Sequence, residues 1–293
     1  MTAGVKKHKY VVITPVRDEE AYVRLTIESM IGQTIRPAEY VLVNDGSKDK
    51  TGQIMDEYAR QYSWIHAVHR PDRGFRKVGG GIIEAFNAGL ERVTVKDWDF
   101  LSKMDGDLSF DADYFEKCFE EFEKDPRLGI GGGYLYHLTN GKRELELNPL
   151  FHVRGGVKIY RRACWEAIGG LWVGPGSDTL DDVKANMLGW RSRSFPQLLI
   201  RHHRVTGTAY GRWGAAVKDG RSDYVSGYHP LFVLAKSFAR LKRKPYIIGS
   251  LGLLWGHIKC HLNGTQRVND PQLIKYLRQQ QMARLLGRET IWK

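Results

Sequence analysis

The feature that most constrains the fold is the regular alternation of apolar runs with amphipathic segments at the start of the chain. Segments that favour strands and segments that favour helices follow each other in the order 10–16, 19–33, 39–47, 50–62, 65–70, 81–93 and 98–107, and the strands at 39–47 and 98–107 end in polar turn residues. Strands that alternate with helices favour a mostly parallel sheet with helices on both faces. We therefore expect an α/β fold, in which ligands bind beyond the carboxyl ends of the strands.

Acidic residues lie at the ends of two of these strand-like runs. Asp45 lies at the end of the second run, and Asp105 and Asp107 stand on either side of Gly106 at the end of the last one. Two carboxylates two residues apart on a turn repel each other unless a cation or a hydrogen-bond donor compensates, which favours a bound metal or sugar nucleotide. A solvated turn uses the same residue types, so this motif alone leaves both interpretations open.

A calcium loop of the EF-hand type is a competing interpretation of residues 105–116, because acids recur there at similar spacing. However, Phe110 occupies the sixth position, where such a loop requires glycine for its sharp turn. The segment before Asp105 also favours a strand rather than the helix that an EF-hand requires. These two departures argue against a calcium loop.

Composition narrows the class of protein. The 293 residues are 42% hydrophobic, which is enough for one large α/β domain or for a domain with a smaller appendage. The net charge of +12 favours an anionic partner such as a nucleotide, a nucleic acid or an acidic membrane surface. The three cysteines are far apart, which argues against a zinc site or a disulfide framework and fits a reducing cytoplasm.

Four ordered motifs give a more specific prediction. They are "VVITPVRDEEAY", "YVLVNDGSKDKT", "EAFNAGL" and "KMDGDLSFDADYFE". In this order the chain resembles, over roughly residues 10 to 215, the inverting family-two glycosyltransferases of the GT-A fold, in their bacterial exopolysaccharide or lipid-glycan branch. The resemblance implies a Rossmann-like, mostly parallel sheet with helices on both faces, forming a catalytic domain over 1–213, followed by a basic helical extension over 214–293.

The resemblance also implies roles for individual residues around a nucleoside-diphosphate sugar of the UDP or GDP type. Asp107 would bind Mg²⁺ or Mn²⁺ at the donor diphosphate, and Asp105 would hold the ribose or the donor sugar. A histidine at the end of the last strand, His202 or His203, would join the metal site. The nucleotide pocket would be lined by Thr14, Pro15, Glu19, Asp45, which would bind the base, and Arg73, with Lys77 as an equal alternative to Arg73.

A base is also implied, because inversion requires an acceptor hydroxyl to lose its proton on the face opposite the leaving group. In the family an acidic pair opens a helix that ends in a glycine and an aromatic residue, with the base eleven positions before that glycine. Counting back from Gly189 selects Asp178, although Ser177 replaces the usual first acid of the pair. Asp181 and Asp182 remain alternatives, and the macrodipole of a helix would equally favour such acids in its first turns.

The last part of the chain combines basic and apolar residues. Lys236, Arg240 and Lys242 lie beside Phe238, and an apolar stretch at 246–258 follows that is shorter than a membrane-spanning helix. An interfacial membrane anchor and a helical cap packed on the catalytic domain both fit this pattern. We expect a cytoplasmic protein, peripheral on the membrane if the anchor forms, with a glycan or lipid-linked acceptor.

Two other functions compete with glycosyl transfer. A sugar nucleotidyltransferase would carry a glycine-rich basic loop directly after the first strand, whereas "TPVRDEE" is acidic there and contains no glycine. A nucleic-acid-binding protein would use the positive charge, but the sequence has no recognised nucleic-acid motif. We therefore expect no nucleic-acid partner.

Overall fold

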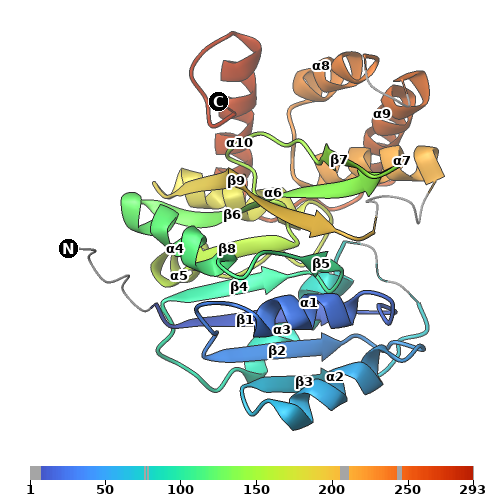
Figure 1. Cartoon of the computed structure of the whole chain (residues 1–293). Coiled ribbons are helices and arrows are strands. Elements are labelled where there is room, and N and C mark those ends of the chain that lie inside the picture. The colour runs from blue at the N-terminus through green and yellow to red at the C-terminus, as the bar shows by residue number, and fades with distance from the viewer. Residues whose placement is uncertain (1–7, 76, 78, 205–210, 243–245, 293) are drawn as a thin grey trace.

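In the computed structural model, residues 8–75, 77, 79–204, 211–242 and 246–292 are described. They form one nine-stranded sheet in the order β3-β2-β1-β4-β8-β6-β9-β5, with β7 paired to β6 (Figure 1). The strands are β1 (Tyr10–Val16), β2 (Glu39–Asn44), β3 (Ile65–His69), β4 (Phe100–Met104), β5 (Leu108–Ser109), β6 (Leu128–Thr139), β7 (Lys142–Leu145), β8 (Val157–Arg161) and β9 (Arg191–His202).

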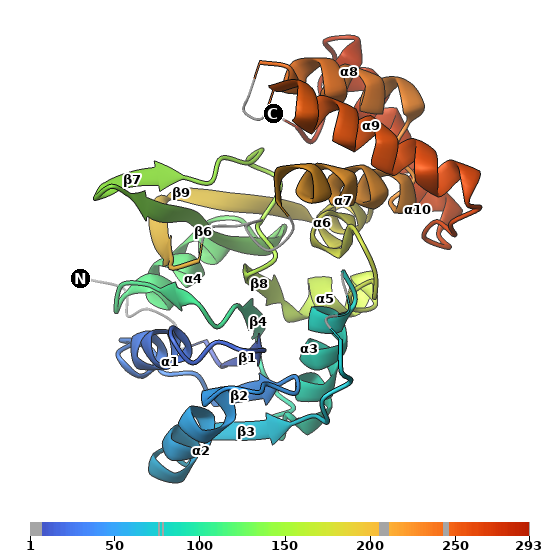
Figure 2. The ribbon, with the colours of Figure 1, turned by 90° about the vertical axis from the view of Figure 1, so that its right-hand side faces the viewer.

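Helices cover both faces of the sheet and form the C-terminal part of the chain (Figure 2). They are α1 (Val23–Ile31), α2 (Thr51–Gln61), α3 (Gly81–Arg92), α4 (Tyr114–Lys124), α5 (Arg162–Ile168), α6 (Ser177–Met187), α7 (Gly211–Val225), α8 (Pro230–Arg240), α9 (Tyr246–Leu262) and α10 (Pro271–Leu285).

The N-terminal half of the sheet matches the expected α/β pattern. β1 lies between β2 and β4 and is parallel to both, and β3 is parallel to β2. Val12 and Leu42 pack with α1, α2 and α4 on one face, while Ile13 packs with Phe86 of α3 on the other. Burial on both faces explains why these strands read as continuous apolar runs rather than as alternating ones.

Beyond β4 the sheet is mixed, which corrects the expectation of a mostly parallel arrangement. β8 runs antiparallel to β4 and β6, and β5 runs antiparallel to β9, whereas β6 and β9 are parallel. No helix lies between β6 and β8; a hairpin to β7 and an irregular segment connect them. A parallel neighbour requires a crossover connection, and a chain that returns without one pairs antiparallel.

Close contacts fix the C-terminal helices to one another. A Cβ atom added to Gly220 of α7 would lie 1.9 Å from the Leu253 carbonyl oxygen of α9, so glycine allows these two helices to touch. α10 packs on α6, where Leu277 joins Leu180 and Val183 in a shared apolar cluster. The predicted domain boundary between 213 and 214 falls in the first turn of α7. Within the described ranges, no helix has the length and apolar character needed to cross a bilayer.

Candidate active site

Acidic residues from three strands meet at one edge of the sheet. Because β1, β2 and β4 are parallel neighbours, their carboxyl ends lie side by side (Figure 1). Glu19 follows β1, Asp45 follows β2, and Asp105 and Asp107 follow β4. The structure therefore brings together the strand-end acids that the sequence places far apart.

Arginines surround Asp45. Its carboxylate accepts a hydrogen bond from Arg70 Nη1 at 2.6 Å and another from Arg73, while Arg17 donates to its carbonyl oxygen at 3.0 Å. Lys77 instead pairs with Glu84 at the start of α3. Of the two basic residues that the sequence leaves open, Arg73 is the one that contacts Asp45. Neither Arg70 nor Arg17 could be singled out from sequence alone.

The turn at Asp105–Asp107 sits directly on β1. A Cβ atom added to Gly106 would lie 2.3 Å from Val16 Cγ1, so this position admits only glycine without a local rearrangement. Thr14 and Pro15 are buried in the same strand, and the Thr14 hydroxyl is fully enclosed beside the buried Tyr40 hydroxyl. Thr14 and Val16 therefore lie beneath the turn, whereas Pro15, between them in the strand, faces the other side of the sheet.

Two adjacent glycines, Gly155 and Gly156, each lie against a carboxylate. A Cβ atom on Gly156 would lie 2.3 Å from Asp105 Oδ2, and one on Gly155 would lie 2.3 Å from Asp178 Oδ1. The buried Lys103 donates to Asp105 Oδ1 at 3.0 Å and to the Gly155 carbonyl at 2.7 Å. Asp105 and Asp178 thus lie against the same glycine pair, although 73 positions separate them in the chain.

His202 lies between two carboxylates. Its Nε2 is 3.3 Å from Asp107 Oδ2, and its Nδ1 is 2.7 Å from Glu146 Oε1, which Arg154 also contacts. Burial disfavours the charged imidazole, but Asp107 and Glu146 outweigh this and raise the pKa of His202 to about 10. Burial likewise opposes ionisation of Glu146, yet His202 and Arg154 lower the pKa of that carboxyl to about 2.

The donor set fits a Mg²⁺ or Mn²⁺ ion held partly by substrate. Asp107 presents a carboxylate oxygen, and His202 would offer Nε2 once that nitrogen gives up its proton to the incoming ion. Glu146 contacts the far ring nitrogen, Nδ1, as carboxylates do behind metal-bound histidines. The described part of the chain contains no cluster of three or more histidine, cysteine or acidic residues suited to a metal. Ligands from outside the protein, such as water, would complete the coordination, as is common for Mg²⁺.

His203 points elsewhere. Its Nε2 contacts the Ser109 hydroxyl, and its ring stacks on Tyr22 with centroids 5.7 Å apart. Arg204, which sequence reasoning missed, donates to Glu19 Oε2 at 2.5 Å and lies 4.0 Å from Asp107 Oδ2. His202 is therefore the histidine that faces Asp107, and Arg204 links Glu19 to the same carboxylate.

The three acids of α6 occupy different environments. Asp178 is exposed, whereas Asp181 and Asp182 are buried. Lys158, also buried, lies 2.6 Å from Asp181 Oδ1 and 3.1 Å from Asp182 Oδ2, and it donates to the Asp178 carbonyl at 2.8 Å. The Tyr160 hydroxyl donates to Asp181 Oδ2 at 2.6 Å. Asp181 and Asp182 are thus bound within the protein, and only Asp178 presents its carboxylate to solvent.

The pKa values of the α6 carboxyls also shift in different directions. Surrounding protein atoms desolvate Asp178, but the positive charges of Lys103 and Lys158 outweigh this effect and lower the pKa of its carboxyl. Burial raises the pKa of Asp182, and Lys158 only partly compensates. Burial disfavours the charged form of Lys158 as well, yet the two adjacent carboxylates raise its pKa. Asp178 is therefore ionised and accessible at neutral pH.

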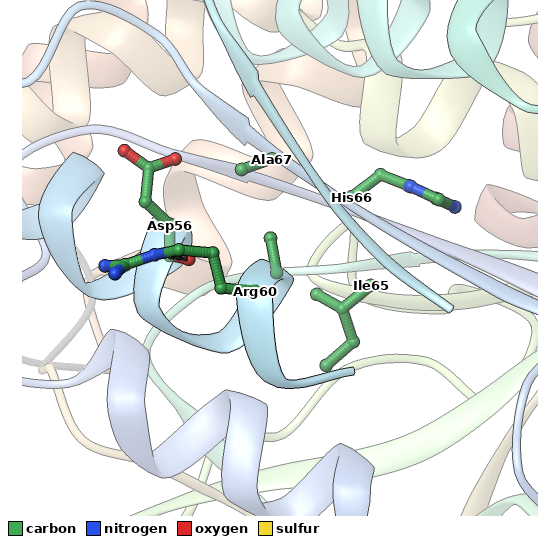
Figure 3. Close-up of a pocket in the computed structure, with 6 residues that line it drawn as sticks. Asp56, Arg60, Ile65, His66 and Ala67 are labelled. Carbon is green, nitrogen blue, oxygen red and sulfur yellow. Dashed lines mark hydrogen bonds between the residues drawn. The ribbon is translucent and has the colours of Figure 1, made fainter. Parts of the chain in front are cut away.

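A depression on the outer side of the molecule is separate from these residues. It lies between α2 and the edge strand β3, where Asp56, Arg60 and His66 line it (Figure 3). None of the predicted site residues lines it.

Comparison with known proteins identifies the family. The model of the family described as "Glycosyl transferase family 2" matches residues 11–168, which is more than half of the chain. The chain belongs to glycosyl transferase family 2. The uncharacterized glycosyltransferase EpsJ of Bacillus subtilis (strain 168) is 28% identical to this family 2 chain over 132 residues. That match covers 45% of the chain and 35% of EpsJ, so it spans only about a third of its relative.

Solved structures of low sequence identity share the fold. The mannosyltransferase PcManGT from Pyrobaculum calidifontis, in complex with GDP-Man and Mn²⁺, has a TM-score of 0.56 at 16% identity, covering 97% of this chain and 76% of its own. GalNAc-T7 with UDP, GalNAc and Mn²⁺ has a TM-score of 0.58 at 13% identity, covering 89% of this chain and 58% of its own. These similarities confirm the expected GT-A fold, with a mixed rather than mostly parallel sheet.

Proposed function

We propose that this family 2 chain transfers a sugar from a nucleoside-diphosphate sugar to a hydroxyl group of a glycan or lipid-linked acceptor, with inversion at the sugar carbon. The observation that carries the proposal is the approach of Asp105 and Asp178 to the same glycine pair. It sets an exposed carboxylate beside the turn that would hold the donor. The donors bound by PcManGT and GalNAc-T7 support a nucleotide sugar of the GDP or UDP type.

Asp107 and His202 would hold Mg²⁺ or Mn²⁺ at the diphosphate. When bound, the ion would neutralise the negative charge that develops on the departing nucleoside diphosphate. Glu146 would hold the proton on Nδ1 of His202, so that Nε2, which faces Asp107, is the nitrogen that gives up its proton when the ion binds. The presence of Mn²⁺ in both structural relatives agrees with this assignment.

The remaining strand-end residues would bind and orient the donor. Asp45, held by Arg70 and Arg73, would accept hydrogen bonds from the nucleotide base. Asp105, fixed by Lys103, would accept them from ribose or donor-sugar hydroxyls. Thr14 and Pro15 would contribute the floor of this pocket, and Glu19 would position Arg204 beside the diphosphate.

Asp178 would accept the proton of the acceptor hydroxyl. Its carboxylate is exposed and ionised, so it is available to a hydroxyl that enters from solvent. Asp181 and Asp182 would instead position α6, because both are paired with the buried Lys158. This division assigns catalysis to one of the three acids and anchoring to the other two.

A sugar nucleotidyltransferase is the alternative that shares an α/β sheet and metal-binding acids. The segment after β1 carries Arg17, Asp18 and Glu19 rather than a glycine-rich loop, and Asp18 and Glu19 bind neighbouring loops. That segment offers no cradle for a triphosphate, so the geometry favours transfer of the sugar.

A donor panel tests the proposal. UDP- and GDP-linked sugars are incubated with the protein and Mn²⁺, release of the nucleoside diphosphate is measured, and the anomeric configuration of any product is read by NMR. We expect release with at least one donor, an inverted product, and loss of turnover in Asp178→Asn. Asp97→Asn is the matched control, because Asp97 is exposed and precedes β4 at the other end of the strand. Pyrophosphate formation from a sugar phosphate and a nucleoside triphosphate would instead support the alternative.

A further inference from the structure

Helix α9 carries an apolar stripe that nothing in the described structure covers. Ile247, Leu251, Trp255 and Ile258 recur at helical spacing, and their exposed fractions lie between 47% and 64%. The opposite side of α9 is occupied, because its glycines pack on α7: a Cβ atom on Gly256 would lie 2.2 Å from the Val217 carbonyl oxygen. The helix therefore has one face fixed to the protein and one apolar face directed away from it.

Helix α8 extends this surface. The hydroxyls of Ser237 and Ser250 lie 2.6 Å apart, which joins α8 to α9, and Phe238 beside that contact is 62% exposed. Figure 2 shows the two helices side by side on the outer side of α7, away from the sheet. We call this surface, formed by the exposed apolar side chains of α8 and α9, the α8–α9 face. Exposed apolar patches of this kind mark protein or membrane contact sites.

The charge around the α8–α9 face selects its partner. Residues 224–269 contain no aspartate or glutamate and seven lysines or arginines. Lys236 and Arg240 pair with Asp223 and Asp219 of α7, so these two acids are already paired and do not neutralise the other lysines. Lys242 and Lys259 are exposed beside the apolar residues. An anionic lipid surface complements this charge, whereas a second copy docked by two-fold symmetry would place its lysines against these.

We propose that the α8–α9 face docks on the surface of a bilayer that contains anionic phospholipid. The two helices would lie in the interfacial plane, with Trp255 and Phe238 inserted at the level of the headgroups. The described helices are unsuited to crossing the bilayer, which agrees with a docked rather than a spanning arrangement. This inference rests on exposure and charge alone and is independent of the proposed transfer reaction.

Docking would also orient the candidate active site. A Cβ atom on Gly252 would lie 3.3 Å from Trp213 Cε3, so the first turn of α7 lies directly against α9. The chain reaches α7 shortly after Arg204, which contacts Glu19 at the strand-end edge. A docked α8–α9 face would therefore hold the start of α7 one helix away from the lipid surface and fix its orientation there.

Vesicle flotation with the full chain tests the proposal without any readout of activity. The vesicles contain phosphatidylcholine alone or phosphatidylcholine with phosphatidylglycerol. We expect the wild-type chain to float with the anionic vesicles and to remain behind with the neutral ones. The double variant Phe238→Ser/Trp255→Ser should bind the anionic vesicles at least about tenfold more weakly than the wild type, since both side chains would lie in the interface. Lys242→Glu/Lys259→Glu should abolish the preference for anionic lipid.

Leu147→Ser/Leu286→Ser is the matched control, because these leucines are 75% and 61% exposed outside the α8–α9 face. It should bind as the wild type does. The proposal is overturned if the wild type does not float, if it floats equally with both vesicles, or if the control loses as much binding as Phe238→Ser/Trp255→Ser. Light scattering gives a further refuting outcome: a dimer that Phe238→Ser/Trp255→Ser converts to monomer would assign the face to a second copy.

Discussion

Replacing Lys158 by methionine should destabilise the protein by about 4 kcal/mol near pH 7. Lys158 is the shared cation of two buried carboxylates, at 2.6 Å from Asp181 and 3.1 Å from Asp182. Methionine keeps the length and apolar character of the side chain but removes the charge. One of the two carboxyls must then take up a proton to stay buried beside the other.

The magnitude follows from that proton. Holding a carboxyl neutral near pH 7, about three units above its ordinary pKa, costs about 4 kcal/mol at roughly 1.4 kcal/mol per unit. Removing one partner of a buried ion pair typically costs about 3–5 kcal/mol, which agrees. The Tyr160 hydroxyl and the His152 ring remain as polar partners of the two carboxyls, but neither replaces the ammonium group.

The cost should depend on pH in a defined direction. A carboxyl whose pKa is raised in the folded state contributes its stability fully below its unfolded pKa and loses it as the pH rises. The deficit of Lys158→Met relative to wild type should therefore shrink by about 3 kcal/mol between about pH 7 and about pH 5. Asp182, whose pKa is already raised by burial, is the carboxyl that we expect to take up the proton.

Urea unfolding of both proteins at the two pH values measures this effect. Lys117→Met is the matched control, since Lys117 pairs with Asp113 on an exposed helix surface and its loss should leave the free energy of unfolding nearly unchanged. The double variant Lys158→Met/Asp181→Asn should recover much of the loss, because only one buried carboxylate remains. A deficit below about 1 kcal/mol, or one that is equal at both pH values, would refute the proposed anchoring of α6.

Three further predictions concern the candidate site. Asp178→Asn should lower kcat by about 10²- to 10⁴-fold and leave the free energy of unfolding nearly unchanged, because the Asp178 side chain is exposed. Steady-state kinetics and urea unfolding measure these two quantities, and an unchanged kcat would exclude Asp178 as the base. Glu146→Gln should weaken the binding of Mn²⁺ in the presence of nucleoside diphosphate by about 10- to 100-fold, as measured by electron paramagnetic resonance titration. Equal Mn²⁺ affinity of the variant and the wild type would show that Glu146 does not orient His202. Gly155→Ala should reduce kcat without changing nucleotide affinity, since the added Cβ would lie 2.3 Å from Asp178 Oδ1. The control is Gly32→Ala, whose Cβ would meet no atom closer than 3.4 Å, and equal kcat values for the two variants would argue against the contact between Gly155 and Asp178.

Local sequence patterns predict much of the N-terminal half. The runs at β1, β2 and β4 are mostly apolar because both faces of these strands are covered, although Lys103 interrupts the run at β4. The acids that follow these strands reach one edge of the sheet because the strands are parallel. The buried face of α1 does not follow from apolar character alone, because Val23, Ile27 and Met30 are buried whereas the equally apolar Leu25 is exposed.

Contacts between distant segments are not visible in such patterns. Lys103 and Lys158 lie within strands, where a charged residue usually faces solvent, and only the fold shows that each meets buried acceptors. Gly155 likewise reads as an ordinary turn residue, and its role depends on Asp178, more than twenty positions later. The antiparallel direction of β8 is also not visible in local patterns, because it depends on the pairing of β8 with β4 and not on the periodicity of β8 itself.

The central claim is that a divalent ion held by Asp107 and His202 would bind the diphosphate of an activated sugar, beside the strand-end acids that would hold its base and its sugar. Calorimetric titration of UDP and GDP, with Mn²⁺ or with a chelator, tests it most directly in the wild type and in Asp107→Asn. We predict that at least one nucleotide binds the wild type, that Mn²⁺ tightens this binding about tenfold or more, and that Asp107→Asn removes the tightening. Binding of equal strength with Mn²⁺, with the chelator and in the Asp107→Asn variant would contradict the claim.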